Sequence, residues 1–133
     1  MPSIHNILIP TVDYPPIEGG IGSVALELAR EYAARGHWVT VVAPWFEGMQ
    51  CFDAAEPYEV VRFRGYGLGW LRLLPFLKAA GPYARQADLL LAINISYAGP
   101  LGLLARKRWG RPYICFAYAY EFLKFGRLPF ARP

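Results

Sequence analysis

Three glycines within a four-residue stretch form the part of the sequence best suited to bind a ligand. Gly19, Gly20 and Gly22 follow an apolar run at 7–9 and precede a helical pattern that begins at Ser23. Glycine lets the backbone adopt positive φ angles and come close to a ligand. The following helix directs its unpaired N–H groups and the positive end of its dipole toward this loop. This arrangement is typical of a phosphate site, and a loop whose glycines only permit tight turns is the alternative.

Apolar runs alternate with helical patterns along the whole chain and must position this loop. Expected strands cover 4–9, 38–43, 58–64, 89–94 and 113–118, and expected helices cover 23–35, 70–80, 82–87 and 99–109. Residues 44–57 are expected to form a loop, and Pro75 to delay or kink its helix. The length suits a single domain spanning 1–133. The pattern predicts a Rossmann-like α/β fold, a doubly wound and mostly parallel sheet of about five strands with helices on both faces.

Ligands of such sheets bind beyond the carboxyl ends of the strands. Four side chains near these ends are candidates to line the cleft or bind an acceptor: Tyr14, Asn94, Tyr118 and Glu121. No nucleophile–base pair and no metal-ligand spacing is found among the histidines, cysteines and acidic residues, so we predict neither a metal nor a cofactor.

The charge is divided unequally between the two halves of the chain. Residues 1–61 have a net charge of −6, whereas residues 62–133 have a net charge of +10. No nucleic-acid-binding motif accompanies the basic half, which argues against nucleic acid as a partner. Residues 70–78, with Arg62, Arg64 and Arg85 nearby, form either a basic amphipathic surface for anionic membranes or a helix that simply covers the sheet.

Targeting and membrane-spanning segments are not recognisable in the sequence. The N-terminus lacks the pattern of a signal peptide, and polar residues and glycines interrupt the longest uncharged run, 89–105. The two cysteines lie far apart and form no CxxC motif. We therefore expect a cytoplasmic protein, either free or in peripheral contact with the inner face of the membrane.

A dinucleotide-binding enzyme is one alternative for the glycine loop, because Gly20-x-Gly22-x-x-Ala25 satisfies a loose version of that fingerprint. Residues 10–19 separate the first glycine of this fingerprint from its strand, so the tight turn that the fingerprint requires cannot form. No acidic residue stands at the end of the second strand to bind a ribose. A Walker A loop is excluded because no Gly-Lys-Ser/Thr follows the glycines.

Several spaced features together resemble the N-terminal domain of family 4 glycosyltransferases, which are retaining enzymes of the two-domain GT-B fold. They are Pro15-Pro16-x-x-Gly19-Gly20-Ile21-Gly22, Leu28-Ala29 in a helix, and Arg35-Gly36-His37-x-Val39-x-Val41-Val42-Ala43-Pro44. The later segments Asp88-Leu89-Leu90 and Gly110-Arg111-Pro112 also fit the family.

The resemblance implies that the chain is half of a GT-B fold and helps to transfer a sugar from a nucleotide-sugar donor. Gly19, Gly20 and Gly22 would contact the donor diphosphate, and the domain would otherwise bind the acceptor, for example a lipid-linked molecule or a polysaccharide. The family often has a His-Gly pair where this sequence has Tyr118 and Ala119, with an acid two residues further on, here Glu121.

The family's C-terminal donor domain and its two glutamates eight positions apart have no counterpart here, so catalytic residues stay unknown. We expect the chain to be inactive alone and to need that domain in cis or in trans, whether it is a natural half or a truncation. A non-catalytic, partner-binding module is the competing class.

Overall fold

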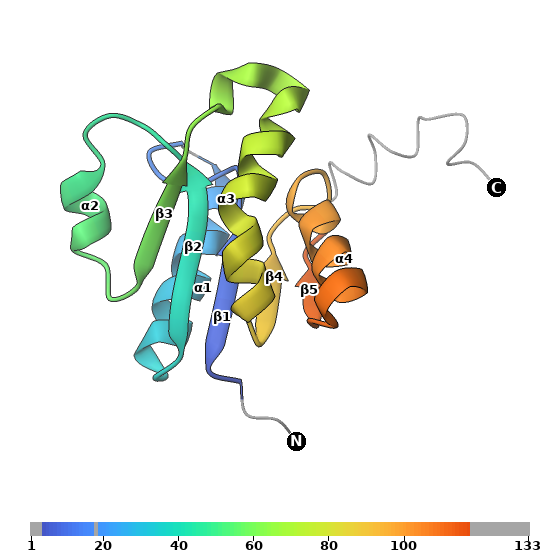
Figure 1. The fold of residues 1–133 in the computed structure, drawn as a ribbon. Helices are drawn as coiled ribbons and strands as arrows, with labels where there is room; N and C mark the ends of the chain where they lie inside the picture. The colour runs from blue at the N-terminus through green and yellow to red at the C-terminus, as the bar shows by residue number, and fades with distance from the viewer. Residues whose placement is uncertain (1–3, 18, 118–133) are drawn as a thin grey trace.

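The computed structural model describes residues 4–17 and 19–117, and its centre is a five-stranded, all-parallel sheet (Figure 1). The strands lie in the order β3-β2-β1-β4-β5. They are β1 (Asn6–Pro10), β2 (Trp38–Pro44), β3 (Glu59–Phe63), β4 (Leu89–Ala92) and β5 (Tyr113–Cys115).

Helices cover both faces of the sheet, so the predicted doubly wound fold is confirmed. They are α1 (Gly20–Ala34), α2 (Gln50–Ala54), the 3₁₀ segment η1 (Tyr66–Arg72), α3 (Leu73–Gln86) and α4 (Ala98–Trp109). Figure 1 shows α1 behind the sheet and α3 with α4 in front of it. α1 ends before Gly36, which has a φ of +90°, and α4 ends at Gly110 with a φ of +68°. Both are left-handed positions that glycine adopts without strain.

Successive residues of the central strands pack into separate cores on the two faces. In β1, Ile7 and Ile9 pack with Ala25 of α1, whereas Leu8 packs with Phe76 of α3. A parallel sheet covered on both sides buries every side chain of its central strands. This explains why the strands appear in the sequence as nearly continuous apolar runs.

Two local expectations were wrong. Residues 44–57 include the short helix α2, and the two helical pieces expected at 70–80 and 82–87 are one helix, α3, with Pro82 inside it. Pro75 lies in the first turn of α3, where its missing N–H has no intrahelical partner to lose. The helix therefore starts late, at Leu73, which is one of the two outcomes expected from Pro75.

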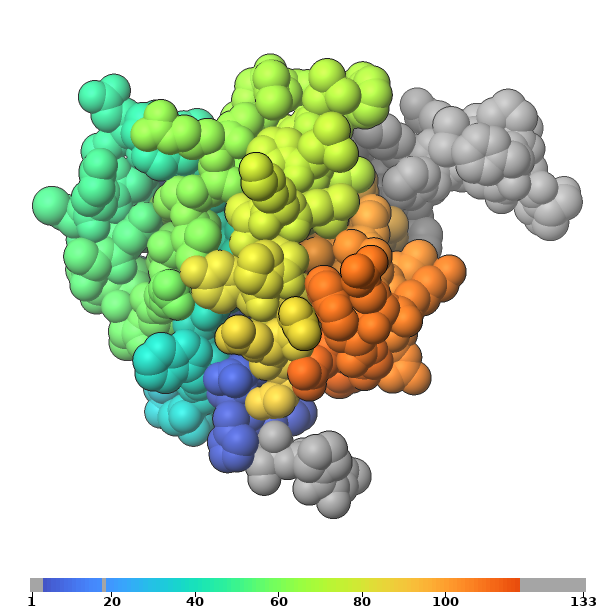
Figure 2. All heavy atoms as spheres, in the orientation of Figure 1, coloured from blue at the N-terminus to red at the C-terminus, as the bar shows by residue number. Residues whose placement is uncertain are grey.

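The order of the strands defines where a ligand would meet the sheet. The chain moves from β1 to β2 and β3 on one side, and then crosses to β4 and β5 on the other. The switch point therefore lies between β1 and β4, at their carboxyl ends, which is the usual binding crevice of open α/β sheets. Residues 11–17 and 93–97, in the loops after these two strands, border this point. In Figures 1 and 2, η1 and the start of α3 form a ridge at the same end of the molecule.

Candidate functional site

The glycine loop forms an open hollow at the N-terminus of α1. Gly19 precedes the helix with a φ of +151°, and Gly20 is its first residue. The loop and the first turn of α1 border a hollow of about 170 Å³, which is lined by Asp13, Ile17, Gly19, Gly20, Ile21 and Gly22. The first N–H groups of a helix have no intrahelical acceptor and attract anions. The geometry thus allows an anion to bind here.

Gly20 and Gly22 are glycines for different reasons. A Cβ atom added at Gly20 would meet no other heavy atom within 4 Å. A Cβ atom at Gly22 would lie 3.3 Å from the backbone N and Cα of Tyr14. Gly22 therefore lets α1 pack closely against the incoming loop, whereas none of the described residues would contact a Cβ atom at position 20.

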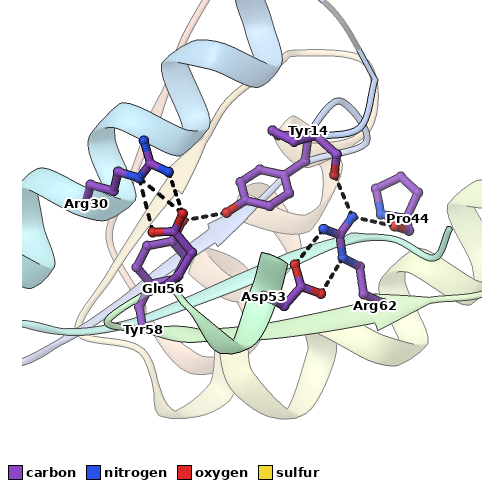
Figure 3. Close-up of polar contacts among 8 residues, drawn as sticks. Tyr14, Arg30, Pro44, Asp53, Glu56, Tyr58 and Arg62 are labelled. Carbon is purple, nitrogen blue, oxygen red and sulfur yellow. Dashed lines mark hydrogen bonds and ion pairs between the residues drawn. The ribbon is translucent and has the colours of Figure 1, made fainter. Parts of the chain in front are cut away.

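Tyr14 does not face the cleft as the sequence led us to expect. Its side chain is fully buried, and its hydroxyl forms a hydrogen bond with the hydroxyl of Tyr58 (Figure 3). Burial raises the pKa of Tyr14 to about 12 and also raises the pKa of Tyr58, so both phenols stay protonated at neutral pH. Tyr14 supports the loop from inside the core, because the apolar interior formed around α1 encloses its ring.

Arg62 of β3 fastens the same loop to its neighbours (Figure 3). Its Nη1 donates to the carbonyl oxygens of Pro15 and Pro44, both at 2.9 Å. Its Nε and Nη2 donate to the carboxylate of Asp53 in α2, at 3.0 and 2.7 Å. Arg62 and Asp53 are therefore internal structural groups, and Arg62 does not contribute to a basic surface as the sequence suggested.

Asn94 follows β4 and is nearly fully buried. Its Oδ1 accepts a hydrogen bond from the N–H of Ala98 at 3.1 Å and a longer one from the N–H of Tyr97 at 3.4 Å. These donors lie at the start of α4, where N–H groups lack intrahelical acceptors. Asn94 thus holds the beginning of α4 at the switch point.

A further group at the switch point was not identified from the sequence. The guanidinium of Arg72 lies over two aromatic rings, with Cζ 4.8 Å from the ring centre of Tyr66 and 4.4 Å from that of Tyr97. Burial raises the pKa of Asp13, and the positive charge of Arg72 opposes this rise. The sequence pattern placed Arg72 on the charged face of a helix, and no local signal distinguished it from other arginines.

The last two predicted site residues, a metal site and a membrane-spanning helix were also considered. Tyr118 and Glu121 lie outside the described residues. Among residues 4–17 and 19–117, no three His, Cys, Asp or Glu side chains are grouped to hold a metal ion. No helix in these ranges has the length and hydrophobicity needed to cross a membrane.

A search of curated proteins found no match to this chain. A family described as the glycosyl transferase 4-like domain matches residues 19–132, a range that starts at the first glycine of the loop and covers most of the chain. The chain therefore belongs to the glycosyl transferase 4-like domain family.

Proposed function

We propose that this domain binds the acceptor and contributes its glycine loop to the diphosphate of a nucleotide-sugar donor. A second domain, in the same or another chain, would hold the rest of the donor and the catalytic carboxylates. Isolated residues 1–133 would then bind the donor weakly and transfer no sugar. The reaction would need no metal or other cofactor from this domain.

The unoccupied space at Gly20 carries this proposal. A glycine that packing among residues 4–17 and 19–117 does not require fits a loop whose backbone must approach a ligand. This glycine lies at a helix N-terminus, beside a hollow at the carboxyl edge of a parallel sheet. All three features favour a phosphate group, and the family favours a glycosyl donor as its source.

Gly20→Ala separates ligand binding from folding. The added methyl group would occupy open space, so we expect the free energy of unfolding to change by less than about 1 kcal/mol. The methyl group would stand where the phosphate should lie, and binding of UDP-glucose or GDP-mannose should weaken at least tenfold in titrations followed by NMR. Gly22→Ala is the opposite control. Its Cβ atom presses on the backbone of Tyr14, so it should lower stability by about 1–3 kcal/mol.

The same titrations test the alternatives. Wild-type affinity for nucleotide sugars in Gly20→Ala contradicts the proposed loop contact. Binding of NADH but of no nucleotide sugar favours a dinucleotide-binding domain. Binding of none of these ligands, even at millimolar concentrations, favours a partner-binding module.

We further propose that the ridge at η1 contacts an anionic membrane surface, which would suit a lipid-linked acceptor. Leu68, Trp70, Leu71 and Leu74 are exposed on this ridge. Residues 60–87 contain five basic residues and no acidic one. Exposed apolar side chains combined with positive charge favour anionic bilayers. Arg62 is internal and Arg85 lies near the other end of α3, so Arg64, Arg72 and Lys78 are the basic residues nearest to the ridge in sequence.

A further inference from the structure

Arg72 is held in place by aromatic rings, but its buried Nε has no hydrogen-bond partner among the described residues. No other hydrogen bond or ion pair joins Arg72 to the part of the chain that the structure describes. Leaving a buried donor without a partner costs about 1–3 kcal/mol. Among the described residues, the fold therefore holds a positive charge in place without giving it a hydrogen-bond acceptor.

The two tyrosine rings hold this charge in place. The Cζ atom of Arg72 lies over the rings of Tyr66 and Tyr97, 4.8 and 4.4 Å from their centres. The rings accept no conventional hydrogen bond from the N–H donors, which point outward along the edge of the planar guanidinium. That edge matches two oxygen atoms of a phosphate or carboxylate group in bidentate geometry.

The location of Arg72 agrees with a binding role. Tyr97 follows β4 and Asp13 follows β1. The positive charge of Arg72 lowers the pKa of Asp13, against the effect of burial. These two loops meet at the switch point of the sheet. Asp13 also lines the hollow of the glycine loop. Arg72 therefore lies near both of the loops that border the switch point, on a different element.

We propose that Arg72, held against the rings of Tyr66 and Tyr97, binds an oxyanion of a substrate, either a phosphate or a carboxylate group. This site is separate from the N–H groups of the glycine loop. The oxyanion is either part of the acceptor or part of the donor diphosphate, and choosing between these two sources rests on the proposed transferase function.

NMR of ¹⁵N-labelled chain 1–133 tests this site directly, with inorganic phosphate as the probe. The Nε–H signal of Arg72, assigned by its loss in Arg72→Gln, should shift and saturate as phosphate is added. Arg72→Gln should weaken phosphate binding by roughly ten- to a hundredfold, which corresponds to one or two charge-assisted hydrogen bonds. Arg85→Gln is the matched control, because Arg85 is exposed at the other end of α3. It should bind phosphate like the wild type.

A second pair of variants tests the role of the rings. Tyr97→Phe keeps the ring that covers the guanidinium, so binding should stay within about twofold of the wild type. Tyr97→Leu removes the ring and should weaken binding several-fold. Any of three results would overturn the proposal. The chemical shift of the Arg72 Nε–H signal could stay unchanged as phosphate is added, Arg72→Gln could bind phosphate with wild-type affinity, or the two Tyr97 variants could bind phosphate equally well.

The backbone signals of Gly20 and Ile21 separate this inference from the proposed function. If phosphate changes the chemical shifts of these amides but not that of the Arg72 Nε–H group, the Arg72 site is wrong and the glycine-loop proposal stands. If phosphate changes only the Arg72 shift, the Arg72 site stands and the glycine-loop contact is wrong. Addition of UDP or GDP then identifies the source. If the signals of Arg72 and of the loop amides shift with the same Kd for the nucleotide, the oxyanion belongs to the donor. If the Arg72 signal still shifts on adding phosphate while the nucleotide is bound, the oxyanion belongs to the acceptor.

Discussion

Replacing Arg62 with glutamine should destabilise the domain far more than replacing an arginine on its surface. The side chains of Arg62 and Asp53 are only 8% and 17% exposed. The substitution removes four hydrogen bonds that join β3 to α2, to the proline loop and to the end of β2. It also leaves the Asp53 carboxylate without its cation. Removing one partner of a buried ion pair costs about 3–5 kcal/mol, and we expect a loss of this size.

Urea unfolding followed by circular dichroism measures this loss. Arg35→Gln is the matched control, because Arg35 pairs with Glu31 at a site where both side chains are more than 60% exposed. It should cost less than about 0.5 kcal/mol. Arg62→Lys keeps the charge but not the planar fork, so it should lie between the two. The double variant Arg62→Gln/Asp53→Asn should lose less than the sum of the single losses, because no charge is left unpaired.

The result also shows what Arg62 does for the glycine loop. If it holds the loop, Arg62→Lys should speed amide hydrogen exchange at Ile17, whose N–H donates to the carbonyl of Tyr14 at 3.0 Å. Exchange at Ile9, in the middle of the sheet, should change less. A loss of stability in Arg62→Gln no larger than in Arg35→Gln would refute the reasoning, because it would mean that the buried pair behaves like a surface pair.

Two further predictions follow from the charges and the exposed ridge. The raised pKa of Asp13 means that its carboxyl group stays protonated to higher pH in the folded than in the unfolded protein. Stability is then lost as the pH rises through the folded pKa, so Asp13→Asn should gain stability relative to the wild type between about pH 4 and pH 7. The free energies of unfolding of Asp13→Asn and the wild type are measured in urea at these two pH values. An equal difference between the two proteins at both pH values would contradict this prediction. Trp70→Ala should weaken co-sedimentation with anionic vesicles by about tenfold. Trp38→Ala, which changes a similarly exposed tryptophan at the amino end of β2, should have no effect. Equal effects of the two variants would argue against the ridge as the contact.

The sheet was predictable because its pattern is local. Each central strand is an apolar run, and Gly36 and Gly110 mark the ends of α1 and α4. α2 was missed because five residues are too few to show a helical period. The single helix α3 was missed because Pro82 is tolerated once packing of Phe76 and Ala84 stabilises the helix on both sides of it.

The glycine loop was predictable as a candidate site, but the separate roles of its residues were not. Gly20 and Gly22 look equivalent in the sequence, and only the position of the Tyr14 backbone distinguishes them. Tyr14 itself appeared to be a ligand-facing residue, because it stands in a loop at the edge of the sheet. Its burial depends on Tyr58, which lies 44 residues further along the chain. Contacts of this range leave no periodic signal in a single sequence.

The arginines of the basic half show why charge alone could not define the site. Arg62 and Arg72 are ten residues apart and contribute equally to the net charge. Arg62 is surrounded by a carboxylate and two carbonyl oxygens, so its hydrogen-bonding capacity is used within the fold. Arg72 is surrounded by two aromatic rings, which hold the cation but accept no conventional hydrogen bond from its edge. The neighbours of each arginine thus separate a group that supports the loop from one that we propose as a binding group for a substrate. The two Arg→Gln variants should fail in different ways, with the Arg62 variant losing stability and the Arg72 variant losing anion binding.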